Sequence, residues 1–417
     1  MDRKRMLDRF LQYVRVDTTA REGATTYPST PGQLELGKLV VAQLREMGIS
    51  DASQDEHGIV LATIPANNGR SKPVVAFNSH FDTSPETTGA NVRPQVIEKY
   101  AGGDIPLPGN PSQIITVDKC PALKNLVGKT LITSDGHTLL GGDDKAGMAI
   151  MMELAQHLIE NPAIQHGPVR LLFTCDEEIG RGVQHVDIAR VAADVCYTFD
   201  GGGQNDVDQE TFSADLATVG LHGANMHPGI AKDKMINAIR MAGSFLEKMP
   251  RDVAPERTDG RVGFLHPYIL EGSVAKSEIK ILLRSFETVE LEPLAQRLRE
   301  IAREVEHEFT GGRVEVQIKK QYRNMRDGLI REPRAVEFAV EAHRRLGREP
   351  KLTIIRGGTD GSQLTEQGLP TPNLSSGQHN IHSPLEFACL DEMLAACEVG
   401  IEIIELWANA AESTSDF

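Results

Sequence analysis

Hydrophobic and polar residues alternate with two different spacings in the first half of the chain. Short and almost wholly apolar runs predict buried β-strands at residues 73–79, 168–174 and 195–199. Residues 33–47 and 147–160 instead carry apolar side chains at helical spacing. Strands that alternate with helices in this way are typical of a mainly parallel sheet flanked by helices.

The pattern changes after about residue 210. Residues 278–283 and 313–319 alternate with period two, and further strands are expected near 214–221 and 268–275. Two amphipathic helices accompany these strands. The first is expected to bury Met235, Ile236, Ile239, Leu246 and Met249, and the second Leu291, Leu294, Leu298, Ile301, Val305 and Phe309. These elements predict an α+β module with a four-stranded antiparallel sheet and two helices.

The α/β alternation resumes at about residue 323, with an expected helix at 333–346, a strand at 351–355 and a final helix at 390–410. A chain of 417 residues is also too long for one ordinary hydrophobic core. The sequence therefore predicts an α/β fold with a discontinuous larger domain, residues 1–210 and 323–417. Residues 211–322 are expected to form an inserted α+β domain.

Composition and charge narrow the possible functions. The chain has 44 Lys and Arg against 59 Asp and Glu, a formal net charge of −15, and so acidic a surface repels nucleic acid. No apolar run approaches the roughly 20 residues that span a bilayer, and the N-terminal MDRKRMLDRF lacks the apolar stretch of a signal peptide. The five cysteines contain no C-x-x-C pair and are expected to be reduced and buried. We therefore expect a cytoplasmic protein with no nucleic-acid or membrane partner.

Acidic and histidine residues follow the predicted strands or lie in Gly-rich loops. They are His80 and Asp82 in HFD, Asp143 and Asp144 in GGDDKAG, Glu177 and Glu178 in DEEIG, Asp200 in FDGGG, and His382 in NIHSPLEF. Because the carboxyl ends of parallel strands share the edge where ligands bind, we expect these residues to meet in one cleft. Each cluster alone also has an ordinary explanation: a solvated histidine, a helix N-cap, a pair of exposed acids, or an Asp-Gly turn.

Two of the clusters have spacings that suit metal chemistry. His80 and Asp82 are two residues apart, so in an extended chain they project to one face, as a metal ligand and the acid that orients its ring do. The adjacent Glu177 and Glu178 diverge in an extended chain, so one can bind a metal while the other acts as a general base.

Taken together, these residues indicate a metal site more strongly than any one cluster does. Two histidines with three or four carboxylates and no thiolate suit Zn²⁺, Mn²⁺ or Co²⁺ rather than a structural Cys-rich zinc site. Five ligands hold two ions only if one carboxylate bridges them, an arrangement used for hydrolysis. The sequence contains no H-E-x-x-H and no G-x-S-x-G motif that would indicate a different hydrolytic site.

Eight segments together resemble the tripeptide aminopeptidase branch of a co-catalytic dizinc metallopeptidase family, whose other members include aminoacylases and carboxypeptidase G-type enzymes. The segments are SHFDTSPE, KYAGGDI, TLLGGDDKAG, DEEIGRG, FDGGG, MHPGIAK, IRGGTDG and NIHSPLEF. The resemblance implies that His80 and Asp200 bind one metal ion, that Glu178 and His382 bind the other, and that Asp143 bridges them. It also implies a cis peptide between Asp143 and Asp144, Asp82 as the residue that orients His80, and Glu177 as the general base.

The resemblance further implies a catalytic larger domain and an inserted lid that also forms a homodimer. His227 on the lid would stabilise the oxyanion, and Arg284 and Arg356 would grip the carboxylate of the peptide. The chain departs from the family pattern in having Ser285 after the module arginine. It also has an additional His379, a rival ligand three residues before His382.

The function expected on this basis is that of a metal-dependent aminopeptidase. It would release the N-terminal residue from tripeptides with two divalent ions, Zn²⁺ first and Mn²⁺ or Co²⁺ as alternatives, and a bridging water activated by a glutamate base. The alternatives on the same dimetal site are a dipeptidase, a carboxypeptidase and an N-acyl amino acid deacylase. Outside the hydrolases, the alternatives are a peptide-binding protein with a degenerate site and an acidic protein that buffers metal.

Overall fold

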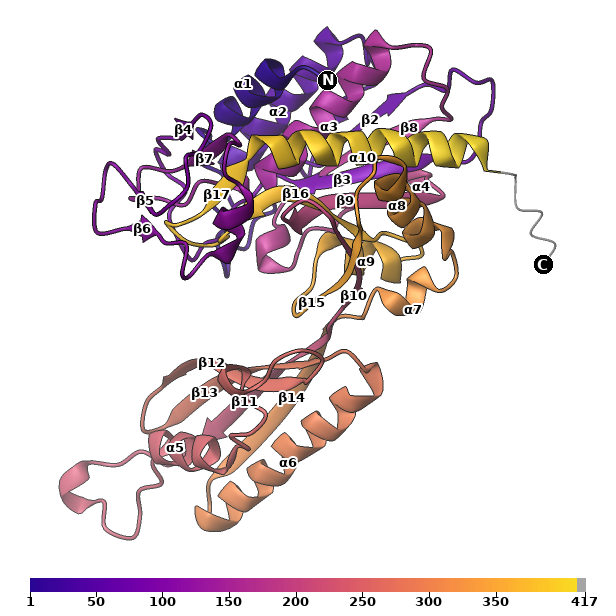
Figure 1. Cartoon of the computed structure of the whole chain (residues 1–417). Helices are drawn as coiled ribbons and strands as arrows, with labels where there is room; N and C mark the ends of the chain where they lie inside the picture. Colours follow the sequence, from indigo (N-terminus) through magenta and orange to yellow (C-terminus); the bar gives the residue numbers. More distant parts are fainter. Residues whose placement is uncertain (411–417) are drawn as a thin grey trace. The chain divides into compact units, whose positions relative to one another are not determined.

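The computed structural model describes residues 1–410, and the chain divides into two compact units. The first contains Met1–Gln209, Met325–Ile354 and the chain from Thr359 onward, and the second contains Glu210–Asn324 and Ile355–Gly358. Figure 1 shows the helices and strands of both units, most of them labelled. Within the described residues, every helix is too short or too polar to cross a membrane. All five cysteines are buried and free.

The larger unit is built on an 11-stranded sheet. Its centre is parallel and consists, in spatial order, of β8 (Val169–Thr174), β3 (Val75–His80), β9 (Val195–Gly202) and β16 (Asn373–His379). Antiparallel strands continue the sheet past β8 with β2 (Val60–Ile64) and β1 (Ser53–Gln54), and past β16 with β17 (Phe387–Cys389), β7 (Leu131–Thr133) and β4 (Gln95–Ile97). Off this path, β10 (Asp206–Thr211) pairs with β16 and with β15 (Lys351–Ile355). The predicted α/β fold is confirmed, with its parallel strands at the centre of the sheet.

Helices cover both faces of this sheet (Figure 1). Val75, Phe77 and Tyr197 belong to a large core that also contains residues of α1 (Arg3–Tyr13), α2 (Pro31–Glu46), α3 (Gly142–Glu160), α8 (Arg334–Arg345) and α10 (Leu390–Asn409). Ala76, Leu172 and Cys196, which alternate with those residues along the strands, belong to a smaller cluster with α4 (Ile188–Val191) and α9 (Asp360–Glu366). Because both faces are buried, these strands have continuous apolar sequences. The remaining short elements of this unit are α7 (Arg326–Leu329) and the pair β5 (Ile105–Pro106) and β6 (Ile114–Ile115).

Helix α3 is the central helix of the larger core. It starts at Gly142, five residues before the predicted helix, and Asp143 and Asp144 inside its first turn have non-helical φ and ψ angles. Every residue from Gly142 to Ala155 is buried, including the charged Glu153. The Glu153 carboxylate accepts hydrogen bonds from the Asp2 backbone N–H at 2.7 Å and from the Arg5 guanidinium at 2.8 Å, and so links α3 to the start of α1.

The second unit contains a four-stranded antiparallel sheet with two helices, as predicted. The strand order is β12 (Phe264–Gly272), β13 (Lys276–Ser285), β11 (Ser213–His222) and β14 (Arg313–Tyr322). Helices α5 (Ala238–Lys248) and α6 (Leu291–Glu308) bury their apolar faces against alternate strand residues such as Val219 and Ile281. This unit therefore has a hydrophobic core of its own.

The prediction for the first of these helices was wrong in detail. Helix α5 begins at Ala238, because the side chain of Asn237 caps it by accepting hydrogen bonds from the backbone N–H groups of Ile239 and Arg240. Met235 and Ile236 therefore precede the helix, and Ile239 is 52% exposed. The buried residues of α5 are instead Ala238, Met241, Ala242 and Phe245.

The two units divide differently from the predicted boundaries at residues 210 and 323–324 and at one further short segment. Residues Ile355–Gly358 belong to the second unit, although the sequence division placed them in the first. The backbone N–H of Phe212 donates to the carbonyl groups of Ile355 and Gly357 at 3.2 and 3.1 Å. The Arg356 guanidinium also lies 5.1 and 5.7 Å from the ring centres of Phe212 and Phe264. These contacts assign Arg356 to the second unit.

The buried His343 predicts acid sensitivity of the larger unit. Its side chain on α8 is 1% exposed, its Nδ1 has no hydrogen-bond partner within residues 1–410, and burial lowers its pKa to about 4. An unfolded histidine has a pKa of about 6.5, so between pH 6.5 and 4 the unfolded chain binds a proton that the folded chain does not. Acidification through this window therefore favours unfolding. We expect His343→Leu to reduce the loss of unfolding free energy between pH 7 and pH 4.5 by about 2 kcal/mol.

The measurement is urea denaturation of the metal-free protein at the two pH values. The control is His307→Leu, which removes an exposed histidine near the end of α6 and should leave the pH dependence as in the wild type. Equal losses of stability in wild type and His343→Leu would contradict this account of His343.

Candidate metal centre

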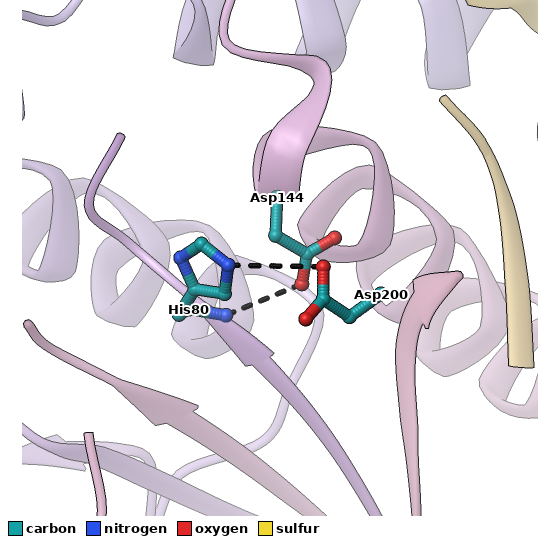
Figure 2. A group of neighbouring side chains, drawn as sticks. All are labelled: His80, Asp144 and Asp200. Carbon is teal, nitrogen blue, oxygen red and sulfur yellow. Dashed lines mark hydrogen bonds and ion pairs between the residues drawn. The ribbon is translucent and has the colours of Figure 1, made fainter. Parts of the chain in front are cut away.

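Two parallel strands deliver His80 and Asp200 to one side of the sheet. Strands β3 and β9 pair in register as far as Asn78 and Thr198, and His80 and Asp200 follow two residues later on each strand. Because side chains alternate between the faces of a sheet, both therefore point to the same face. The Nε2 atom of His80 lies 3.8 Å from Oδ1 of Asp200 (Figure 2).

Asp143 lies between two imidazole rings. It is at the start of α3, after Gly141 with its positive φ of 84°, and the peptide that joins it to Asp144 is cis, as the resemblance implies. Its Oδ1 lies 3.0 Å from Nε2 of His80, and its Oδ2 lies 3.3 Å from Nε2 of His382. Each carboxylate oxygen thus faces a different histidine, which is the arrangement that a bridging carboxylate requires.

Glu178 and His382 form the other end of this group. Glu178 follows strand β8 in a short 3₁₀ turn, Glu177–Ile179, and its Oε2 lies 3.0 Å from Nε2 of His382. Its second oxygen, Oε1, is buried and has no hydrogen-bond partner within the described residues. His382 itself has a positive φ of 62°, and its carbonyl group accepts a hydrogen bond from the hydroxyl of Thr87 at 2.9 Å.

The five predicted ligands therefore form one continuous run of nitrogen and oxygen atoms. The order is Asp200, His80, Asp143, His382 and Glu178, with neighbouring ligand atoms 3.0–3.8 Å apart. Hard oxygen and imidazole donors of this kind suit Zn²⁺, Mn²⁺ and Co²⁺, and the unpaired buried oxygen of Glu178 has an acceptor site that a cation would satisfy. The residues present thus fit two divalent ions.

Asp144 lies in the same group but has other partners (Figure 2). Its Oδ2 accepts a hydrogen bond from the backbone N–H of His80 at 3.3 Å, and its Oδ1 accepts one from the backbone N–H of Gly147 at 3.2 Å. The carboxylate therefore fixes the end of β3 against the first turn of α3.

Asp82 connects His80 to the turn that carries both glutamates. Its two oxygens accept hydrogen bonds from the backbone N–H groups of Glu177 and Glu178, each at 3.0 Å. Its Oδ1 also lies 3.4 Å from Nδ1 of His80, while its backbone carbonyl lies 3.1 Å from the same nitrogen. One aspartate thus constrains the ring of a predicted ligand and the backbone of the predicted base.

Burial and mutual repulsion shift the proton equilibria of this group. Burial, together with the charge of Asp143, raises the pKa of Glu178 to about 8 and that of Asp200 to about 6. Burial also raises the pKa of Glu177 well above its usual range. Burial opposes protonation of His382, but hydrogen bonds to Asp143 and Glu178 raise its pKa to about 11. Without a cation this group retains protons, so metal binding must release them.

The three predicted substrate-binding residues lie in the second unit. His227 is exposed, and its Nδ1 accepts a hydrogen bond from the backbone N–H of Gly229 at 3.1 Å. The buried guanidinium of Arg284 donates to the carbonyl groups of Asp215 and Leu283, and it lies 5.5 Å from the centre of the Tyr322 ring.

Arg356 is held in the same way by its own unit. Its guanidinium donates to the backbone carbonyl groups of Gly260, Val262 and Thr258 at 2.8–3.3 Å. The guanidinium groups of both arginines thus donate to backbone carbonyl groups of their own unit.

The rival histidine has a different role. Nε2 of His379 lies 2.7 Å from a carboxylate oxygen of Glu392 on α10, and its ring stacks on Phe387 with 4.6 Å between the ring centres. These contacts attach His379 to the helix and the neighbouring strand. Of the two histidines in SGQHNIH, it is His382 that lies beside Asp143 and Glu178.

Sequence reasoning missed two residues that support the ligands. The Gln378 side-chain amide donates to both the carbonyl group and Oδ1 of Asp200, at 3.0 and 3.2 Å. The Glu386 carboxylate accepts backbone hydrogen bonds from the loop that carries Asp143. A single amide or acid in a loop has no periodicity or spacing that indicates such a contact, and only the position of Glu386 four residues after His382 could have drawn attention to it.

The comparisons with known proteins agree with this geometry. Residues 135–406 match the model of the family described as Peptidase family M20/M25/M40. Peptidase T of Geobacillus kaustophilus is 43% identical over 409 residues, which are 98% of this chain and 100% of the relative. Peptidase T of a Listeria monocytogenes strain is 42% identical over 405 residues, 97% of this chain and 99% of the relative.

Two solved structures share the fold. Aminopeptidase PepT from Bacillus cereus matches with a TM-score of 0.74 at 24% identity and covers 97% of this chain and 98% of its own. A tripeptidase from Staphylococcus aureus matches with a TM-score of 0.77 at 22% identity and covers 98% of this chain and 100% of its own. The chain therefore belongs to peptidase family M20/M25/M40, and its similarity to peptidase T over almost its whole length identifies it as a metallo-exopeptidase of that family.

Proposed function

We propose that the protein is a metal-dependent aminopeptidase that releases the N-terminal residue from tripeptides. The observation that carries the proposal is Asp143, whose two oxygens lie 3.0 and 3.3 Å from two different imidazole rings. The relatives named peptidase T and the solved tripeptidase with the same fold support the choice of substrate.

The proposed metal centre holds two divalent ions, with Zn²⁺ as the first choice and Mn²⁺ or Co²⁺ as alternatives. His80 and Asp200 would bind one ion, Glu178 and His382 the other, and Asp143 both. When bound, such a pair polarises a carbonyl oxygen and lowers the pKa of a water molecule. The distances between neighbouring ligand atoms support this division, because the Nε2 atom of each histidine lies within 3.8 Å of Asp143 and of one further carboxylate.

In this proposal Glu177 is the general base. It accepts a proton from the attacking water and later transfers the proton to the leaving amine. Its backbone N–H is fixed by Asp82, and burial raises the pKa of its side chain well above the usual range for a glutamate, which favours uptake of a proton by this carboxylate. The roles of His227, Arg284 and Arg356 toward the oxyanion and the carboxylate of the peptide remain predictions from the family resemblance.

A panel of peptides tests the proposed substrate. Free di-, tri- and tetrapeptides and an N-acetylated tripeptide are incubated with the metal-loaded protein, and the released residue is identified by chromatography. We expect release of the N-terminal residue from the free tripeptide, no cleavage of the blocked one, and loss of activity with a chelator that returns on metal addition.

Each alternative predicts a different outcome in the same panel. A dipeptidase would prefer the dipeptide, and a carboxypeptidase or deacylase would accept the N-acetylated tripeptide. Absence of hydrolysis at every metal loading would contradict the proposed function and favour a peptide-binding or metal-buffering protein.

The adjacent glutamates allow a paired test of base and ligand. Glu177→Gln should retain two metal ions per chain and lower kcat by at least about 100-fold, because it removes the proton acceptor. Glu178→Gln should lower the metal content, because it replaces the carboxylate that lies 3.0 Å from His382. Metal analysis after gel filtration and steady-state kinetics measure the two effects. Wild-type kcat in Glu177→Gln would show that this residue is not the base.

A further inference from the structure

The turn before the proposed bridging ligand is held by a single buried carboxylate. Glu386 is 1% exposed, and its Oε2 accepts hydrogen bonds from the backbone N–H groups of Leu140 and Gly141, both at 2.8 Å. Its Oε1 accepts one from the backbone N–H of Asp143 at 3.0 Å. These N–H groups lie just before or in the first turn of α3, where backbone N–H groups have no acceptor within the helix. The carboxylate supplies acceptors for three of them.

The turn that Glu386 holds has an unusual backbone. Gly141 has a φ of 84°, and Asp143 has φ −80° and ψ 106°, which is not a helical conformation. A Cβ atom on Gly142 would lie 3.2 Å from Oε1 of Glu386, so the carboxylate lies directly against the backbone of this turn. A regular helix start would point Asp143 elsewhere. The three hydrogen bonds therefore favour the conformation in which the two oxygens of Asp143 face His80 and His382.

Glu386 lies in the loop that carries His382. Within this loop, the Ser383 hydroxyl donates to the carbonyl of Asn380 at 2.8 Å, and the backbone N–H of Glu386 donates to the carbonyl of Ser383 at 3.1 Å. The backbone N–H of Leu385 donates to the Ser383 hydroxyl at 3.2 Å. These turns fix Glu386 relative to His382, so the contact between Glu386 and Asp143 also fixes the distance between the two proposed ligands.

We propose that Glu386 is a positioning residue of the metal centre, which sets the orientation of the bridging Asp143 relative to His382. This inference rests on the proposed dimetal function. Glu386 makes no contact with the ions in this scheme and acts through the backbone of the Asp143 turn. Partners of this kind orient metal ligands, and their loss usually weakens metal binding or activity by 10- to 100-fold.

The variant Glu386→Gln tests this role with little change of volume. An amide has one acceptor oxygen and one NH₂ group, so at least one of the three backbone N–H groups would face another donor. If the amide oxygen remains with Leu140 and Gly141, the NH₂ group faces the N–H of Asp143. A second variant, Glu386→Asp, keeps the charge and shortens the side chain by one methylene group.

A matched control exists on the same helix. Glu153 is likewise a fully buried carboxylate with a backbone N–H and a guanidinium as partners, and it lies in the second half of α3. Glu153→Gln should therefore lower Tm without changing the metal centre. The metal-free proteins are compared by thermal unfolding, and Zn²⁺ affinity is measured by titration in competition with a chromophoric chelator.

We expect Glu386→Gln to weaken Zn²⁺ binding by 10- to 100-fold and to lower kcat on a tripeptide with KM within twofold of wild type. Glu386→Asp should fall between Glu386→Gln and the wild type in both measurements, and Glu153→Gln should keep wild-type Zn²⁺ affinity. Wild-type affinity in Glu386→Gln would overturn the proposal. So would an equal loss of affinity in Glu153→Gln, because destabilisation of α3 alone would then explain it. If Glu386→Gln does not fold, wild-type affinity in Glu386→Asp overturns it in the same way.

The wild-type protein separates this inference from the proposed function. If the wild type binds no Zn²⁺ or cleaves no peptide, the proposed function fails before any variant is considered. If the wild type binds two ions and cleaves tripeptides while Glu386→Gln matches it in Zn²⁺ affinity, only the role of Glu386 is wrong.

Discussion

The metal centre is governed by the repulsion between carboxylates that the fold brings to one edge of a parallel sheet. Two unit charges 4 Å apart interact by about 4 kcal/mol at an effective dielectric constant of 20. Asp143 lies within 3.3 Å of both His80 and His382, while Glu178 lies 3.0 Å from His382 and Asp200 lies 3.8 Å from His80. In the protein without metal, protons offset this charge. Burial and the charge of Asp143 raise the pKa of Glu178 to about 8, and hydrogen bonds to Asp143 and Glu178 raise that of His382 to about 11 although burial opposes its protonation. Two divalent ions would take the place of those protons.

Other carboxylates of the same group hold the proposed ligands in position through hydrogen bonds to the backbone. Asp82 accepts the N–H groups of the glutamate turn, Asp144 accepts the N–H of His80, and Glu386 accepts the N–H of Asp143. In each case a buried carboxylate accepts hydrogen bonds from backbone N–H groups in a turn or at the end of a strand. The acidic residues of the centre thus divide into those whose oxygens face imidazoles and those whose oxygens face backbone amides, and Asp82 does both.

The two arginines predicted to bind the peptide carboxylate also have structural contacts in the second unit. The guanidinium groups of Arg284 and Arg356 both donate to backbone carbonyl groups of their own unit and stack on aromatic rings. A guanidinium has five N–H donors, so an arginine that makes these structural contacts can still bind a carboxylate. The unit itself has a complete core between its four-stranded sheet and its two helices.

The residue sequence by itself determined the α/β fold with an inserted α+β module and placed the candidate acids and histidines after its strands, and the family resemblance assigned the ligand roles. The apolar runs and the acids that follow them are local features, and parallel strands place their carboxyl ends at a common edge. Only the tertiary structure decided which of His379 and His382 faces Asp143, because the two histidines lie three residues apart in one segment. His379 contacts Glu392 on α10, whereas His382 lies beside Asp143. The same holds for Glu386 and for the assignment of Arg356 to the second unit. The partners of Glu386 and Arg356 are distant in the chain, and no pattern in the sequence indicates which backbone groups a single side chain will contact.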